Sequence, residues 1–209
     1  MSLENRLPRS FYERDTVQVA KDLLGNLVVR RMASSRLLVG RIVETEAYHG
    51  QKDRASHAFR GRTPRNSPMF GPGGIAYVYQ IYGMWNCLNA VTMGIEYPAA
   101  VLIRAISQVP SYPLLQADPR AGSGPGKLCR ALAVEKGMSG ADLVNGDELW
   151  LAEGESPMDR SLLRSGPRIG VGYAEEWAEV PWRFWIAGEP SVSRIPGSRL
   201  PGTTRATGS

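Results

Sequence analysis

Residues 75–92 read IAYVYQIYGMWNCLNAVT, and this stretch carries the clearest fold signal in the chain. Two runs rich in aromatic and β-branched residues, 75–81 and 86–92, flank a short segment that contains Gly83. The pattern predicts two antiparallel strands joined by a tight turn at 82–85. Because side chains alternate along a strand, we expect Tyr77 and Tyr79 on one face, with Tyr82 at or near the tip.

Segments on both sides of this hairpin predict further strands and two helices. Helical spacing predicts one helix over 11–25, with Asp15 or Thr16 as its N-cap, and a second over 128–136. Residues 51–74 are rich in Gly, Pro, Arg and Ser and show no period, which predicts a long loop of the kind that is usually functional. The segments predicted as strands are 27–31, 37–48, 99–106, 149–152, 168–171 and 184–186.

Length and composition limit the class of protein. The 209 residues carry a formal net charge of +5, and 43% of them are hydrophobic, as in a single globular domain rather than a disordered chain. No apolar run is long enough to span a bilayer. Cys87 and Cys129 form no CxxC pair and there are two histidines, so we expect reduced thiols, a cytoplasmic location and neither metal nor other cofactor.

The distribution of charge indicates more than its total. Between Asp53 and Asp118 the only acidic residue is Glu96. A positive face built by this span would attract a polyanion such as nucleic acid. The alternative is uneven scatter without function, because a charge of +5 is common in soluble proteins. The arginines in the span are Arg54, Arg60, Arg62, Arg65 and Arg104.

Two glutamates share one face of the predicted strand 37–48. Glu44 and Glu46 would lie beside Tyr48 on that face, roughly 6.6–7 Å apart along the strand. One interpretation is a general base, or an acid and base pair, that acts at the anomeric carbon of a sugar. The other is an exposed strand edge with solvated carboxylates.

The aromatic residues of the hairpin also allow two interpretations. Tyr82 at an exposed tip would suit a wedge that unstacks base pairs, while rings deeper in the hairpin would stack on an extruded base. Alternatively, the rings simply fill a core. The segment 123–127 (SGPGK), which precedes the second predicted helix, could bind one phosphate or be an ordinary loop-to-helix junction.

Motifs that occur in a fixed order resemble those of a known family. The resemblance covers about residues 7–188, and the family is that of the human-type alkyladenine (3-methyladenine) DNA glycosylases, which lack a helix-hairpin-helix. The motifs are RIVETEAY at 41–48, SH at 56–57, TPRN at 63–66, MF at 69–70, YVYQIYGM at 77–84, Asn89, LIRA at 102–105, GPGKLC at 124–129 and RIGVG at 168–172.

The resemblance implies a fold and an activity. The fold is mixed α/β (α+β), a single compact domain with a curved, mostly antiparallel sheet, peripheral helices and a protruding hairpin that intercalates into DNA. Residues 1–188 would form the catalytic domain. The resemblance does not cover 189–209, whose Pro, Gly, Ser, Thr and Arg content predicts a flexible basic tail. The implied activity is that of a monofunctional glycosylase that removes alkylated purines, namely 3-methyladenine and 7-methylguanine, with hypoxanthine and ethenoadenine as further candidates. The enzyme would act as a monomer on double-stranded DNA containing damaged purines, nucleoid-associated in a bacterium, and leave an abasic site for base excision repair.

The resemblance also implies roles for individual residues. Glu46 would be the general base for the attacking water, which Arg104 and the main-chain carbonyl of Ile169 would help to hold. Glu44 would be structural or secondary, and Tyr82 would fill the gap left in the duplex. The residues implied to surround the flipped base are Tyr48, His57, Tyr79 and Asn89. Those implied to contact the DNA backbone are Arg62, Thr63, Arg65, Met84, Gly126 and Lys127.

Two other functions compete with this one. A non-catalytic protein that binds distorted DNA or RNA would need the basic span and the tyrosine hairpin, but not Glu46. A sugar O-glycosidase would use Glu44 and Glu46 together. It would leave the basic span unexplained.

Overall fold

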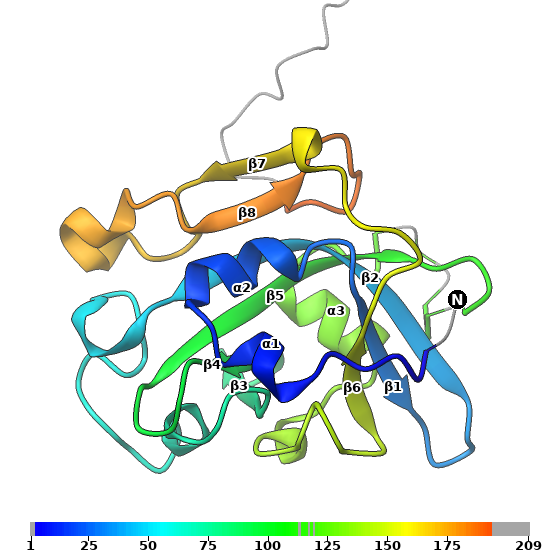
Figure 1. The fold of residues 1–209 in the computed structure, drawn as a ribbon, viewed down its shortest axis with the longest axis horizontal. Helices are drawn as coiled ribbons and strands as arrows, with labels where there is room; N and C mark the ends of the chain where they lie inside the picture. The colour runs from blue at the N-terminus through cyan, green and yellow to red at the C-terminus, as the bar shows by residue number, and fades with distance from the viewer. Residues whose placement is uncertain (1–2, 113, 117, 119, 194–209) are drawn as a thin grey trace, which may run out of the picture.

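The sheet is built around one long strand, β2 (Leu37–Tyr48), in a computed structural model that describes residues 3–112, 114–116, 118 and 120–193. The sheet order is β3-β4-β5-β2-β1-β6, with β8 paired to β2 and β7 to β8, and every pairing is antiparallel. The other strands are β1 (Leu27–Arg31), β3 (Ala76–Ile81), β4 (Trp85–Thr92), β5 (Ala99–Gln108), β6 (Leu149–Ala152), β7 (Leu163–Gly166) and β8 (Arg183–Ile186). The curled sheet with few helices confirms the expected α+β class (Figure 1).

β2 changes one of its partners halfway along. Up to Arg41 it pairs with β1, from Glu44 to Glu46 it pairs with β8, and from Gly40 to Tyr48 it pairs with β5 on its other side. The register with β5 shifts between Ile42 and Thr45, where a β-bulge interrupts the regular alternation. This irregular segment holds Glu44, which therefore lies where β2 changes its partner from β1 to β8.

The helices are shorter than the sequence predicts. The predicted helix over 11–25 is two helices, α1 (Arg9–Tyr12) and α2 (Thr16–Asp22), and Asp15 caps the second by accepting a hydrogen bond from the Gln18 amide at 3.0 Å. The second helix is α3 (Pro125–Ala131), which begins earlier and ends earlier than predicted. In Figure 1, α2 runs across the sheet beside β5, and the Thr45 hydroxyl donates to the Ala20 carbonyl at 2.8 Å. Glu44 and Glu46 instead share Arg104 as a partner, so they lie on one side of β2 while Thr45 between them contacts α2.

The predicted hairpin is present, and its turn is strained. Tyr82 (φ 50°) and Gly83 (φ 70°) both adopt left-handed backbone conformations, and the Met84 amide donates to the Ile81 carbonyl at 3.2 Å. Two positive φ values match the right-handed twist of the paired strands. Tyr82 is 90% exposed, so the turn presents a large aromatic ring to solvent instead of burying it.

Two sequence-based interpretations change with the structure. Part of the predicted tail packs against the domain: Val192 contacts the main core, and the Ser193 amide donates to Glu44 at 2.7 Å, while residues 194–209 lie outside the described part of the chain. The basic span is partly neutralised, because Arg54 pairs with Glu175, Arg62 pairs with Glu96, and Arg104 is buried. Among the described residues no helix is long and apolar enough to cross a membrane.

Candidate active site

A cavity of about 460 Å³ opens between the hairpin, the end of β2 and the segment 169–173. Its wall combines residues from distant parts of the sequence, since β2, β3, β4 and β5 are adjacent in the sheet. Eight of the predicted site residues line it, namely Tyr48, His57, Arg65, Tyr79, Tyr82, Asn89, Arg104 and Ile169. Its volume lies in the range of ligand-sized pockets.

Glu46 lies directly behind this wall with no exposed surface. Its Oε1 accepts a hydrogen bond from the Ile169 amide at 2.7 Å. Its Oε2 accepts from the Tyr48 hydroxyl at 2.8 Å and from Arg104 Nη1 at 3.2 Å. All three donors belong to residues that line the cavity, so the carboxylate is fixed at its edge. Three good donors satisfy a buried carboxylate that would otherwise be strongly destabilising.

Glu44 is buried too, but its partners differ. It accepts from Arg183 Nε at 2.6 Å and from the Ser193 amide at 2.7 Å, and Arg104 Nε lies 3.4 Å away. The interpretation of Glu44 and Glu46 as solvated carboxylates at a strand edge is therefore wrong. Arg183 and Ser193, which donate to Glu44, lie outside the cavity lining, and among the described residues no second carboxylate lines the cavity for an O-glycosidase.

Arg104 connects the two glutamates. Burial by itself lowers the pKa of its guanidinium, but the attraction of Glu46 and Glu44 outweighs burial and raises that pKa. The residue therefore stays charged, and two arginines balance two glutamates in the interior. Such a network needs all its members, because an unpaired buried charge is costly.

The aromatic wall is made by the two tyrosines of β3 and by His57. The Tyr77 and Tyr79 rings lie 5.3 Å apart on one face, as the alternation predicts, and His57 stands edge-on to Tyr79 at 4.4 Å. His57 Nδ1 lies 2.9 Å from the Tyr77 hydroxyl. Packing of the ring, together with the positive charge of Arg65, lowers the pKa of His57 to about 4, although one side of the residue remains open to solvent.

Asn89 and Cys87 complete the wall on β4. The Asn89 side-chain amide donates to the Tyr77 carbonyl at 2.9 Å, which ties it across the β3–β4 pair. Burial raises the pKa of the Cys87 thiol to about 11, so this thiol stays protonated at neutral pH. A protonated thiol is a poor nucleophile, and the cavity offers no activated cysteine.

The predicted DNA-backbone residues lie in different environments, and of the six only Arg65 lines the cavity. Met84, Lys127, Thr63, Arg62 and Arg65 are exposed, but Arg62 is paired with Glu96 and Arg65 donates to the Gln80 carbonyl at 3.1 Å. Gly126 has a packing role: a Cβ there would lie 2.7 Å from the ring of Trp85, the first residue of β4 after the hairpin turn. The segment 123–127 is predicted to precede the helix, but α3 already begins at Pro125, with Gly124 at φ 106° as the N-cap.

A buried ion pair beside the cavity was not among the residues predicted for the site. Asp53 and Arg168 have fully buried side chains and are joined by two hydrogen bonds of 2.6 and 2.9 Å. The strand predicted over 168–171 is wrong, because these residues form an irregular loop that is held by the Arg168 side chain. The signal was an arginine in a glycine-rich motif, but the partner stands 115 positions away, and no local pattern reveals it.

Two further features bear on the chemistry. No lysine lines the cavity within the described part of the chain. In residues 3–193, apart from positions 113, 117 and 119, no group of three His, Cys, Asp or Glu side chains could hold a metal ion.

Comparison with known proteins gives a consistent result. Residues 10–190 match the family described as Methylpurine-DNA glycosylase. A protein of Methanocella arvoryzae is 48% identical over 91% of this chain and 98% of its own length. One of Legionella pneumophila (strain Corby) is 45% identical over 90% of this chain and 98% of its own length. One of Anaeromyxobacter dehalogenans (strain 2CP-1) is 46% identical over 91% of this chain and 87% of its own length. Each of the three is named "Putative 3-methyladenine DNA glycosylase".

Proposed function

The chain belongs to the methylpurine-DNA glycosylase family and is a DNA N-glycosylase, and we propose that it removes alkylated purines, 3-methyladenine and 7-methylguanine, from duplex DNA. The bond hydrolysed is the N-glycosidic bond, and the products are the free base and an abasic site. Hypoxanthine and ethenoadenine are further candidate bases. The enzyme acts as a monomer, in the cytoplasm or at the nucleoid.

The observation that carries the proposal is the setting of Glu46. Its carboxylate is fixed by three donors from cavity-lining residues, two of which, Arg104 and Ile169, are those expected to hold the attacking water. A general base needs both a fixed position and a neighbouring site for water. The main-chain carbonyl of Ile169 would accept a hydrogen bond from the second O–H of that water, which stays on the oxygen.

The reaction begins with extrusion of the damaged nucleotide. A stacked base hides the anomeric carbon, and extrusion costs a few kcal/mol, least for damaged or mispaired bases. Tyr82, exposed at the tip of the hairpin, fills the space that the base leaves in the duplex. The extruded base enters the cavity between Tyr48, Tyr79 and His57, where the faces of the tyrosine rings favour a cationic purine.

Bond cleavage then needs only one proton transfer to the protein. The bond between C1′ and the purine nitrogen breaks, and its electron pair neutralises the cationic alkylpurine, which leaves without protonation. Water attacks C1′ and gives a proton to Glu46, whose negative charge also stabilises the oxocarbenium character of the sugar. With no lysine in the cavity lining of the described chain, hydrolysis is favoured over a Schiff-base lyase.

The test is direct detection of the released base. The protein is incubated with methylated duplex DNA, and the soluble fraction is analysed for free 3-methyladenine and 7-methylguanine. We expect both bases and an equal number of alkali-labile abasic sites, with no strand cleavage before alkali. Absence of any free base would overturn the proposal, and cleavage without alkali would overturn the monofunctional part of it.

The alternative of a non-catalytic protein that binds distorted nucleic acid would need only an exposed Tyr82 beside a cavity, but the family of this chain argues against it. That function predicts that the wild type binds an abasic-site duplex but releases no base. It gives no reason for a buried glutamate that is held by three donors at the cavity.

A further inference from the structure

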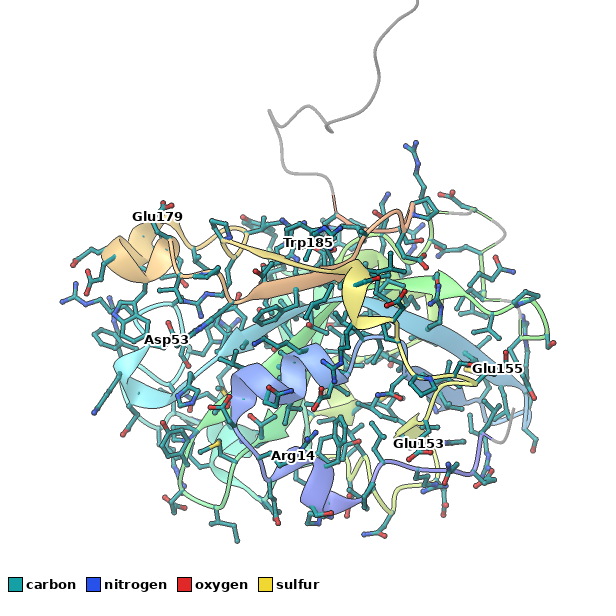
Figure 2. All side chains as sticks on the ribbon, turned by 45° about the horizontal axis from the view of Figure 1, so that its top comes forward. Arg14, Asp53, Glu153, Glu155, Glu179 and Trp185 are labelled. Carbon is teal, nitrogen blue, oxygen red and sulfur yellow. The ribbon has the colours of Figure 1, made fainter. Side chains whose placement is uncertain are left out.

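Arg168 and Asp53 form a buried junction behind the cavity, and neither residue lines it. Both oxygens of Asp53 accept hydrogen bonds from the Arg168 guanidinium. The same guanidinium donates to the Ala47 carbonyl at 2.9 Å and to the Trp177 carbonyl at 3.0 Å. One side chain thus joins the end of β2, the loop after it and the segment Gly172–Ala178, below which Asp53 lies in Figure 2.

Two groups at the cavity depend on this junction. Arg168 directly precedes Ile169, whose amide donates to Glu46 at 2.7 Å. Its guanidinium carbon lies 4.9 Å from the centre of the Tyr48 ring, and the Tyr48 hydroxyl donates to the other oxygen of Glu46. Ala47, which Arg168 also binds, stands between Glu46 and Tyr48 in β2. Arg168 therefore contacts the immediate support of two of the three donors that hold Glu46.

Asp53 extends the junction to the opposite wall. Its carboxylate accepts hydrogen bonds from the His49 amide at 3.1 Å and from the Ala55 amide at 3.0 Å. Ala55 lines the cavity, and His57 follows two residues later in the same loop. The pair consequently fixes the loop that carries His57 relative to the segment that carries Ile169.

We infer that the Asp53–Arg168 pair is a positioning pair for catalysis, which sets the Ile169 amide and the Tyr48 ring against Glu46. This inference rests on the proposed function. Arginine is required because its planar fork donates to four oxygens at once, a geometry that the single ammonium of lysine cannot reproduce. A displacement of about 1 Å at a catalytic group lowers the rate by about 100-fold.

The test compares Arg168→Lys with a control, Arg9→Lys. Arg9 is also paired with an aspartate, Asp142, at 2.7 Å, but both side chains are partly exposed, and the other acceptor of Arg9, the Gly73 carbonyl, is not among the groups that support Glu46. We measure the single-turnover rate of 3-methyladenine release and the dissociation constant for a duplex with an abasic-site analogue. For Arg168→Lys we expect a rate lower by about 10- to 100-fold. We expect its dissociation constant to change by less than about threefold, because Arg168 is buried behind the cavity and does not line it. Arg9→Lys should keep the wild-type rate.

A second comparison separates positioning from a merely structural role. In a Glu46→Gln background, Arg168→Lys should lower the residual rate by no more than about threefold, since residues that act as a unit are not additive. Asp53→Glu, which keeps the charge but moves the guanidinium, should reproduce the loss of rate without loss of binding. Equal rates for Arg168→Lys and Arg9→Lys, or equal losses of rate and binding, would overturn the inference. An inactive wild type would instead overturn the proposed function.

Discussion

At the scale of single residues, the cavity is surrounded by groups in unfavourable states that only a function explains. Tyr82 is a non-glycine residue with φ 50°, a conformation that costs roughly 1–2 kcal/mol, and its ring is exposed. His57 has its pKa lowered to about 4 beside a tyrosine hydroxyl. Glu46 is a buried carboxylate, for which burial alone gives no stability. Strained and perturbed residues of this kind cluster at active sites.

Substitution of Tyr82 should separate stability from activity. Tyr82→Gly is expected to raise the free energy of unfolding by about 1 kcal/mol, because glycine adopts positive φ without strain. The same variant should release 3-methyladenine more slowly by about tenfold or more, because nothing fills the gap in the duplex. Tyr82→Phe, which keeps the ring, is the control for both measurements. A glycine variant with wild-type activity would show that Tyr82 is no wedge.

The protonation state of His57 can be measured directly. With its pKa lowered to about 4, the ring is neutral at pH 7 and repels a cationic purine less than a charged ring would. Since the folded pKa lies below the unfolded value of about 6.5, the contribution of His57 to stability is complete above pH 6.5 and declines as the pH falls toward 4. NMR titration of the ring protons should give a pKa well below 6.5. A value at or above 6.5 would contradict the packing described for this ring.

At the scale of elements, the sequence predicts most strands and the long loop over 51–74 well, but it predicts the bounds of the helices poorly. Strands β1, β2 and β6 coincide with their predicted ranges, because alternation and β-branched residues are local signals. The break between α1 and α2 and the early end of α3 depend on packing and capping, which helical spacing does not report. β7 was missed, since its four residues, LRSG, resemble a loop and form a strand only because β8 lies beside them.

The same division holds for the candidate site. Motif resemblance brought together the residues on β2, β3, β4 and β5 that the cavity unites. It did not predict the β-bulge in β2 or the pairing of Glu44 with Arg183, because both depend on where β8 and residues 189–193 lie. Long-range ion pairs carry no local sequence pattern, so Asp53 and Arg168 could not be joined from the sequence either.

Removal of the charge at the bulge should destabilise the whole domain. Glu44→Gln leaves Arg183 buried without its carboxylate, and loss of one partner of a buried pair costs about 3–5 kcal/mol. Urea unfolding should therefore show a much lower midpoint with an unchanged m-value. Glu135→Gln, at an exposed glutamate, should unfold like the wild type. A loss below about 1 kcal/mol would mean that Arg183 finds other partners.

At the scale of the whole molecule, the net charge of +5 is less informative than the positions where cations stay unpaired. Ion pairs neutralise Arg54 and Arg62, whereas Lys127 is exposed at the start of α3, two residues after the cavity-lining Pro125. We expect the attraction for a phosphate backbone to act through a few such groups near the cavity mouth. These exposed cations are distinct from the arginines of the buried network, which are paired with glutamates.

Salt dependence of binding tests whether Lys127 contacts DNA. Each phosphate contact contributes about −0.9 to the slope of log affinity against log salt concentration. Lys127→Ala should therefore reduce the magnitude of this slope by about one, for damaged and undamaged duplexes alike. Lys136→Ala, an exposed lysine outside the cavity lining, is the control and should leave the slope unchanged. Equal slopes for wild type and Lys127→Ala would exclude this contact.

The most direct test of the central claim is the single-turnover rate of 3-methyladenine release by Glu46→Gln, measured beside its affinity for an abasic-site duplex. Loss of a general base should lower the rate by about 10²–10⁴-fold. The affinity for the abasic-site duplex should stay close to that of the wild type, because Glu46 is buried behind the cavity wall and the substitution leaves the exposed cations unchanged. A Glu46→Gln variant that releases the base at the wild-type rate would contradict the assignment of Glu46 as the base that activates water.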